Sequence, residues 1–162
     1  MFKEQLAKAF AHSRAHQTQV SLIFIDLDNF KWVNDTKGHD IGDELLQMIA
    51  ERLQQATASD GIVCRLGGDE FTIIIDQYIH AKSVQQVAEL IQQQVSGNVM
   101  LSDFEYQIAL SLGLATGTYK TDNHITIMKK ADIAVYQAKN AGKNTIRQYD
   151  PSVDNLNNQK NR

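Results

Sequence analysis

The chain has 162 residues, 43% of them hydrophobic and 22% charged, which suits a single domain and excludes collagen-like, disordered and disulfide-framework proteins. A formal net charge of -3 excludes a general surface for nucleic acids or anionic membranes, and one cysteine, Cys64, cannot form an internal disulfide. No apolar run reaches the roughly 18 residues of a membrane span, so we expect no membrane segment and a cytoplasmic chain, or a cytoplasmic domain of a larger, membrane-anchored protein.

Hydrophobic periodicity predicts a helix, a buried strand and a second main helix in the first third of the chain. Apolar residues recur at helical spacing over 2–10, and the polar segment 12–19 closes that pattern. Residues 20–27 are apolar and β-branched, as in a strand buried on both faces. A helical stripe then covers 41–53, with Asp40 as a candidate cap of its first turn.

The remainder alternates between strands and helices. The expected elements, in order, are a hairpin of strands 62–66 and 71–76, a helix over 84–95, a strand over 104–115 after a break at Gly97-Asn98, a helix over 125–138, and an edge strand over 145–149. We expect one domain over residues 1–150 and a polar, disordered tail over 151–162.

This order of elements predicts an α+β domain in which a mainly antiparallel sheet carries helices on its faces. Polymerases, cyclases and RNA-binding modules all use such sheets, so the fold alone does not decide the function.

Acidic residues end the first strand, in the segment Asp26-Leu27-Asp28. Two carboxylates two residues apart lie on the same side of the pleat, and a short helix from Phe30 to Asn34 follows. Mg²⁺ prefers such oxygen ligands, and free amides at the start of the helix can receive phosphates. The alternative is that these acids merely begin a turn.

A second acidic cluster lies in the predicted hairpin, in Gly67-Gly68-Asp69-Glu70. Two glycines and an acid are ordinary chemistry for a tight turn. Two acidic strand ends in one small domain favour a function, because adjacent strands could bring Asp26 and Asp69 to one metal site.

The spacing of these and later residues resembles the GGDEF domain of diguanylate cyclases over nearly all of residues 2–149. The matching segments are Asp26-x-Asp28-x-Phe30-Lys31-x-x-Asn34-Asp35, Gly38-His39-x-x-Gly42-Asp43, Gly67-Gly68-Asp69-Glu70-Phe71, Ala131-Asp132 and Tyr136-x-Ala138-Lys139-x-x-Gly142-Lys143-Asn144. The resemblance implies a fold like that of nucleotide cyclases and polymerase palms, with a ferredoxin-like core. It also implies condensation of two GTP molecules into cyclic di-GMP, with release of pyrophosphate, between two transiently paired domains.

Carried over by position, the metal ligands for Mg²⁺ or Mn²⁺ are Asp26, the carbonyl of Leu27 and Asp69. The resemblance gives catalytic roles to Asp69, also a candidate base, and to Glu70. It gives phosphate-binding roles to the loop of Asn29, Phe30 and Lys31, and to the cations Lys139 and Lys143.

Asn34 and Asp43 match the family's guanine-reading pair, and His39 follows the pattern beside the nucleotide. A carboxylate can accept from N1-H and N2-H of guanine, whereas adenine presents an acceptor at N1. Asp43 therefore argues against ATP. We expect Trp32 to pack on the short helix rather than to stack on a base, and Cys64 to be a small core residue.

The chain departs from the family in three places. The positions of an inhibitory Arg-x-x-Asp site that binds the product hold Ala58 and Gly61, so that site is expected to be absent. Position 143 holds Lys where the family commonly has Arg, which predicts weaker phosphate binding. The usual leader before the first helix is also missing, and we expect an N-terminal sensory or regulatory domain in the parent protein.

Three functions compete at this point. The first is an active diguanylate cyclase, and the second is a regulatory GGDEF domain that binds GTP without turnover. An RNA-binding module with a similar sheet is disfavoured by the acidic balance and by the lack of an aromatic RNA-binding pattern.

Overall fold

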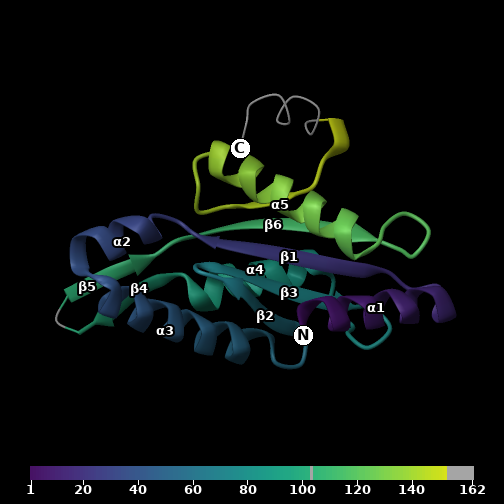
Figure 1. Cartoon of the computed structure of the whole chain (residues 1–162), viewed down its shortest axis with the longest axis horizontal. Coiled ribbons are helices and arrows are strands. Elements are labelled where there is room, and N and C mark those ends of the chain that lie inside the picture. The colour runs from purple at the N-terminus through teal and green to yellow at the C-terminus, as the bar shows by residue number, and fades with distance from the viewer. Residues whose placement is uncertain (103, 153–162) are drawn as a thin grey trace.

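The apolar run Val20–Leu27 forms strand β1 at the centre of a five-stranded sheet, in a computed structural model that describes residues 1–102 and 104–152 (Figure 1). Its neighbours β3 (Glu70–Asp76) and β6 (Leu110–Gly117) both pair with it antiparallel. The edge strands are β2 (Ile62–Gly67), antiparallel to β3, and β7 (Ile146–Gln148), parallel to β6. The predicted α+β class with a mainly antiparallel sheet is confirmed.

Helices cover both faces of this sheet. Their bounds are α1 Phe2–His16, α2 Phe30–Lys37, α3 His39–Thr57, α4 Val84–Val95 and α5 His124–Asn140. Side chains of β1 alternate between two cores: Leu22 and Phe24 pack with α1 and α5, whereas Ile23 and Ile25 pack with α2, α3 and α4. Figure 1 shows α5 along one side of the sheet and α3 on the other. Because β1 is buried on both sides, the acidic residues at its end are candidates for a functional site.

The expected single strand over 104–115 is wrong, because the chain forms two strands there. Strand β5 (Phe104–Ile108) pairs with β4 (Gly97–Leu101) in a separate two-stranded sheet, and β6 starts after Ala109. The carbonyl of Ala109 accepts a hydrogen bond from the amide of Asp28, so the division occurs where β1 ends. Strand β4 begins at Gly97, so the expected break at Gly97-Asn98 lies within a strand.

Helix α1 continues through the polar segment that was expected to end it. Ser13 is buried, and His12 Nδ1 lies 2.6 Å from Asp76 Oδ2 on β3, so these polar side chains bond within the fold. The helix ends at His16, and the residue that caps it, Gln17, is left-handed with φ 59°. Most of the tail expected to be disordered, residues 153–162, lies outside the described residues.

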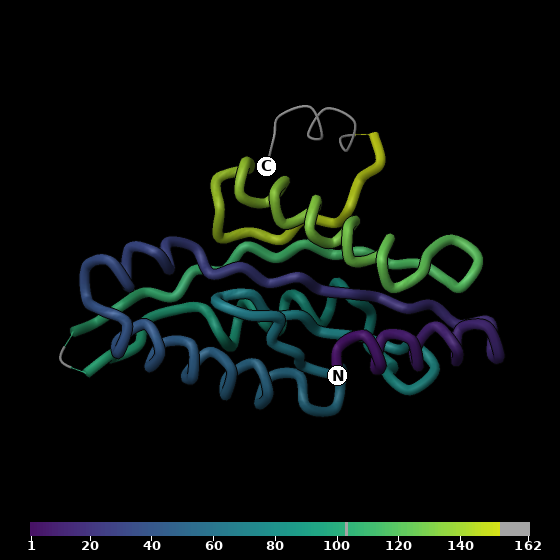
Figure 2. Tube along the Cα trace, in the orientation of Figure 1, coloured from purple at the N-terminus to yellow at the C-terminus, as the bar shows by residue number. Residues whose placement is uncertain are grey.

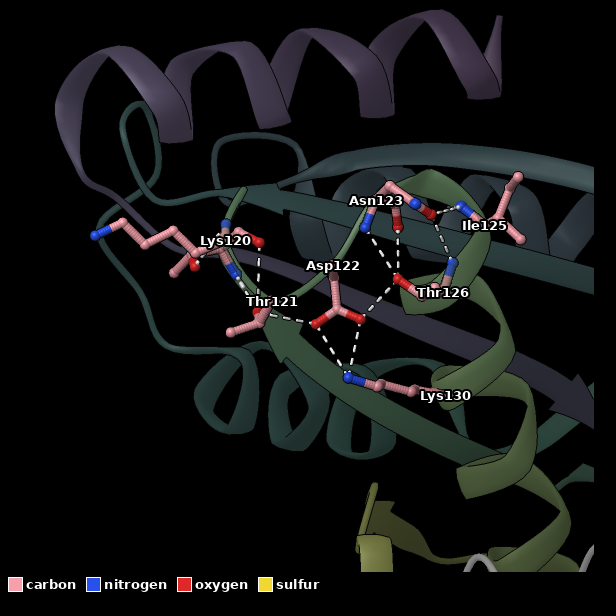
Figure 3. Close-up of polar contacts among 8 residues, drawn as sticks. Lys120, Thr121, Asp122, Asn123, Ile125, Thr126 and Lys130 are labelled. Carbon is pink, nitrogen blue, oxygen red and sulfur yellow. Dashed lines mark hydrogen bonds and ion pairs between the residues drawn. The ribbon is translucent and has the colours of Figure 1, made fainter.

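A buried carboxylate fixes the start of α5. Asp122 accepts hydrogen bonds from the hydroxyls of Thr121 (3.0 Å) and Thr126 (2.8 Å) and forms an ion pair with Lys130 at 2.9 Å (Figure 3). Asn123 caps the helix by accepting from the amides of the next turn. Figure 2 follows the chain from β6 through α5 and back beside β6 as β7. The far end of this well-anchored helix carries Lys139 to the end of β1.

Nowhere in the described part of the chain is a helix long and apolar enough to span a bilayer.

Candidate active site

The acids predicted from the two motifs meet where β1 ends and β3 begins. Asp26 is opposite Glu70 in the antiparallel register of these strands, and Asp69 occupies the turn just before β3. That turn needs its glycines, because Gly67 and Gly68 have φ of 146° and 51°. Three carboxylates from two segments far apart in sequence therefore meet at one end of the adjacent inner strands β1 and β3.

Burial is the main cause that raises the pKa of Asp26 to about 6. The negative charges of Asp69 and Glu70 raise the pKa further, whereas the Lys139 ammonium, 3.3 Å from Asp26 Oδ2, lowers it. Lys139 thus offsets part of the negative charge that these acids place around Asp26.

The donor set suits a hard divalent cation that arrives with a phosphate. Across residues 1–102 and 104–152, no three His, Cys, Asp or Glu side chains are arranged to hold a metal ion. The predicted set of Asp26, Asp69 and the Leu27 carbonyl does not require three, because Mg²⁺ commonly takes one or two carboxylates and completes its shell with water and substrate phosphate. The residues present therefore fit such an ion.

Asp28 does not face solvent but ties three segments together. It is 2% exposed, and its carboxylate accepts hydrogen bonds from Ser111 Oγ on β6 (2.7 Å) and from the amide of Asn144 (2.8 Å). Lys139 Nζ lies 3.9 Å away and so stands between Asp26 and Asp28. The end of β1 is thereby fixed to β6 and to the connection between α5 and β7.

This fixation brings Lys143 to the loop predicted to bind phosphate. Asn29 and Lys143 are both left-handed, with φ of 62° and 65°, and Lys143 Nζ donates to Asn29 Oδ1 at 3.4 Å. Phe30 is buried in the core, whereas Lys31 in the first turn of α2 is exposed. The loop and one of its two predicted cations are therefore neighbours before any ligand binds.

The predicted guanine pair lies where α2 and α3 meet. The carboxamide of Asn34 packs so closely on Gly42 that a Cβ there would overlap its oxygen. Asp43 is the next residue along α3 and is exposed, as is His39 at the helix start. The Asn34 carboxamide and the Asp43 carboxylate thus lie at one helix junction, and Gly42 leaves room there for the carboxamide.

Sequence reasoning paired Asp28 with Asp26 as a candidate cation site, and it assigned no role to Ser111 or Asn144. The Asp-x-Asp spacing was a signal for Asp28, but its partners are 83 and 116 residues away in sequence. No feature of the sequence near Asp28 identifies these hydrogen-bond partners.

Trp32 does not pack as expected. Its side chain is 51% exposed, and its ring lies nearly parallel to that of Tyr106 on β5. Burial, followed by the charge of Asp28, raises the pKa of Tyr106, so its hydroxyl stays protonated at neutral pH. Cys64 is buried as predicted, and burial also raises the pKa of its thiol.

Neither position of the inhibitory motif holds its charged residue. Ala58 directly follows α3, and Gly61 is buried, with a Cβ there falling 2.6 Å from the Ile73 side chain. An acidic side chain at position 61 would require the β3 core to move.

A mixed sheet with helices on both faces and paired carboxylates at its central strand end define a palm-like α+β domain. Residues 1–145 match the family described as "Diguanylate cyclase, GGDEF domain". The chain therefore belongs to the GGDEF domain family, and the resemblance stated from its motifs is confirmed.

Solved and curated relatives agree with this assignment. A structure of the GGDEF domain of TpbB, also called YfiN, from Pseudomonas aeruginosa superimposes with a TM-score of 0.87 at 29% identity, covering 98% of this chain and 92% of that one. Diguanylate cyclase DgcP of Escherichia coli is 36% identical over 137 residues, which are 84% of this chain and 40% of DgcP. Cyclic di-GMP phosphodiesterase PdeB of Shewanella oneidensis is 35% identical over 161 residues, 99% of this chain and 18% of PdeB. The chain spans less than half of either curated relative.

Proposed function

We propose that this domain condenses two GTP molecules into cyclic di-GMP and releases pyrophosphate, as a diguanylate cyclase. The observation that carries the proposal is the meeting of Asp26, Asp69 and Glu70 at adjacent strand ends beside Lys139. Membership of the GGDEF family and the named activity of DgcP support it.

Asp26 and Asp69, with the carbonyl of Leu27, would hold Mg²⁺ or Mn²⁺. The bound metal would neutralise charge on the α-phosphate and lower the pKa of the attacking 3'-hydroxyl. Asp69 would also accept the proton of that hydroxyl, and Glu70 would support it from the start of β3. Strand register places Asp26 opposite Glu70, and Asp69 is in the tight turn directly before Glu70, so the acids need little rearrangement.

The triphosphate would lie over the loop of Asn29, Phe30 and Lys31, because the free amides at the start of α2 point out of the helix end. Lys143 is already held beside this loop, and Lys139 sits on Asp26 until a substrate phosphate competes for it. Both lysines would offset the charge of the triphosphate.

Guanine would be read between α2 and α3. Asp43 can accept from N1-H and N2-H, and the Asn34 carboxamide beside Gly42 can supply a further donor and acceptor. His39, exposed at the start of α3, would border the nucleotide without an acid-base role.

The reaction would need two copies of the domain. One site holds one activated α-phosphate, so a second GTP-loaded domain must present its 3'-hydroxyl in near two-fold opposition. We also propose an upstream sensory or regulatory domain in the parent protein, since the chain spans 40% of DgcP and 18% of PdeB.

Asp69→Asn tests the proposal directly. Incubation with GTP and Mg²⁺ should give cyclic di-GMP from the wild-type domain, and the variant should lose at least about a hundredfold in rate. Thermal unfolding should be nearly unchanged, because the turn contributes little to the core. Equal turnover by a folded variant would contradict the role of Asp69.

A second candidate function is a silent regulatory domain that binds GTP without condensing it. The likeness to PdeB favours it, because that protein is named for the opposite reaction. Nucleotide analysis separates the two: GTP recovered unchanged but bound by the domain would identify the regulatory function.

A further inference from the structure

An exposed aromatic pair lies beside the phosphate loop and has no role in the proposed chemistry. Trp32, the only tryptophan of the chain, is 51% exposed on α2, three residues after Asn29. One exposed aromatic residue is normal on a protein surface and by itself indicates nothing. Its surroundings are what give it meaning.

The second ring of the pair, Tyr106, has two further contacts within the fold. Tyr106 Oη donates to the carbonyl oxygen of Asp28 at 3.4 Å, and Phe104 packs on it edge to face with centroids 6.3 Å apart. The planes of Trp32 and Tyr106 differ by only 13°, with centroids 6.5 Å apart. This distance is near the upper limit of aromatic contact, roughly 7 Å, so the pair does not saturate the stacking capacity of either ring.

A cavity of about 290 Å³ opens at this pair, at the small end of the range for ligand sites, roughly 300–1,000 Å³. It is lined by Asp28, Asn29, Trp32, Tyr106, Gln107 and Ala109. Asn29 therefore belongs both to this cavity and to the loop predicted to bind phosphate. A ligand in the cavity would continue directly from a phosphate or sugar at that loop.

The lining selects a flat, uncharged and polar ligand. No lysine, arginine or histidine of the described chain lines the cavity, so a phosphate group has no cation there. The carboxylate of Asp28 is already occupied by Ser111 and Asn144. The amides of Asn29 and Gln107 offer both donors and acceptors, and the two rings offer apolar faces. A nucleobase has this combination of a π-face and a polar edge.

We propose that Trp32 and Tyr106 form a stacking site for a second guanine base, distinct from the pair Asn34 and Asp43. The inference rests on the proposed function, because the second base is that of a nucleotide that lies next to the first GTP at Asn29. The base belongs either to the second GTP or to cyclic di-GMP, which share the same chemistry.

The single tryptophan reports on this site directly. Fluorescence of the wild-type domain is titrated with 3'-deoxy-GTP and Mg²⁺, which cannot condense, and separately with cyclic di-GMP. Saturable quenching by 3'-deoxy-GTP assigns the site to the second substrate, and quenching by cyclic di-GMP assigns it to the product. Unchanged emission at concentrations where calorimetry detects both ligands bound would overturn the proposal.

Asp43→Ala shows from which site the signal comes. Quenching that persists in this variant supports a separate site, because the first guanine has lost its carboxylate. Quenching that disappears from the variant with both ligands would show that Trp32 responds to the first site, which overturns the proposal.

Calorimetry on ring variants measures the contribution of stacking. Trp32→Ala should weaken binding of the quenching ligand by about tenfold, whereas Trp32→Phe should stay within about threefold of wild type. Tyr78→Ala is the matched control, because Tyr78 is 49% exposed and lies just past the opposite end of β3. Equal affinity of Trp32→Ala and wild type, with a changed dependence of activity on protein concentration, would identify a protein contact and refute the stacking site.

These outcomes separate this inference from the proposed function. Quenching without formation of cyclic di-GMP from GTP would refute the cyclase and leave the stacking site in place. Formation of cyclic di-GMP without quenching by either ligand would refute the stacking site and leave the cyclase in place.

Discussion

At the scale of one residue, Gly42 leaves the space in which the side chain of Asn34 lies. The carboxamide of Asn34 occupies the space that a Cβ at position 42 would fill. Position 42 directly precedes Asp43, the other residue of the proposed guanine site. The proposed guanine site therefore depends on a residue that has no side chain. Because the obstructing atom ends a flexible side chain, an added methyl group should move Asn34 rather than the backbone.

Gly42→Ala should accordingly weaken GTP binding by about tenfold while changing the free energy of unfolding by no more than about 1 kcal/mol. Calorimetry and urea unfolding measure the two quantities. The control is the same substitution in an Asn34→Ala background, where it should cause no further loss of affinity. A full additional loss there would show that Gly42 acts by another route.

Asp26 links the charge of the site to stability. Its pKa of about 6 lies above the ordinary 3.8, so in the metal-free protein the folded state binds this proton more tightly than the unfolded state. The resulting stability is fully present below the ordinary value and is lost as the pH rises through about 6. Above that pH, the ionised carboxylate opposes folding.

With metal removed by chelation, Asp26→Asn should be more stable than wild type at pH 7.5, by on the order of 1 kcal/mol. This figure allows for partial exposure and for the lost ion pair with Lys139. The difference should shrink at pH 5, where most of the wild-type carboxyl is protonated. Urea unfolding at both pH values checks this expectation, and a difference that did not depend on pH would argue against burial as its cause.

At the scale of elements, α5 is the part that carries Lys139 to the site, and its height above the sheet is set by Gly113. A Cβ on this β6 residue would overlap the backbone of α5 at Ala131 and Val135. Unlike the clash at Gly42, this one involves main-chain atoms on both sides, so neither element can give way locally.

Gly113→Ala should therefore destabilise the domain by about 2–4 kcal/mol, although alanine is normally preferred to glycine within a strand. Denaturant unfolding gives the value, and amide exchange should show weakened protection in α5 before the rest. A neutral or stabilising effect would mean that α5 is not held against β6 as described.

Most elements were predictable because a single periodicity covers each of them. Strand β1 is apolar at nearly every position, and α4 has a regular stripe, so both were predicted with correct bounds. Strands β4 and β5 were not predicted as separate strands, because their pairing and the division at Ala109 depend on hydrogen bonds to distant residues. The site followed the same rule: acids at strand ends were visible in sequence, whereas the partners of Asp28 and the exposure of Trp32 depend on tertiary packing.

At the scale of the whole molecule, the proposed reaction is incomplete in one copy. The sheet presents one set of carboxylates and one phosphate loop, and the described elements include no long heptad helix that would hold a permanent pair. Encounters between isolated domains should therefore be brief.

Specific activity should rise steeply with protein concentration and should increase further when the domain is fused to a dimeric coiled coil, through effective concentration. Turnover measured beside analytical ultracentrifugation tests both expectations. Activity that is independent of concentration in a sample shown to be monomeric would contradict the two-domain mechanism.

The hydrogen bond from the Asn144 amide to Asp28 spans 116 residues of sequence and has a consequence for the order of folding. Contacts between residues so far apart in sequence tend to form late, because the entropy of closing the loop must be paid before the contact is gained. A chain synthesised only as far as α5 already contains every carboxylate of the site but has no Asn144 amide to satisfy Asp28. The left-handed loop at Asn29 thus receives its final support from the last strand connection to be made, and the domain should acquire its complete site only as its final turn docks.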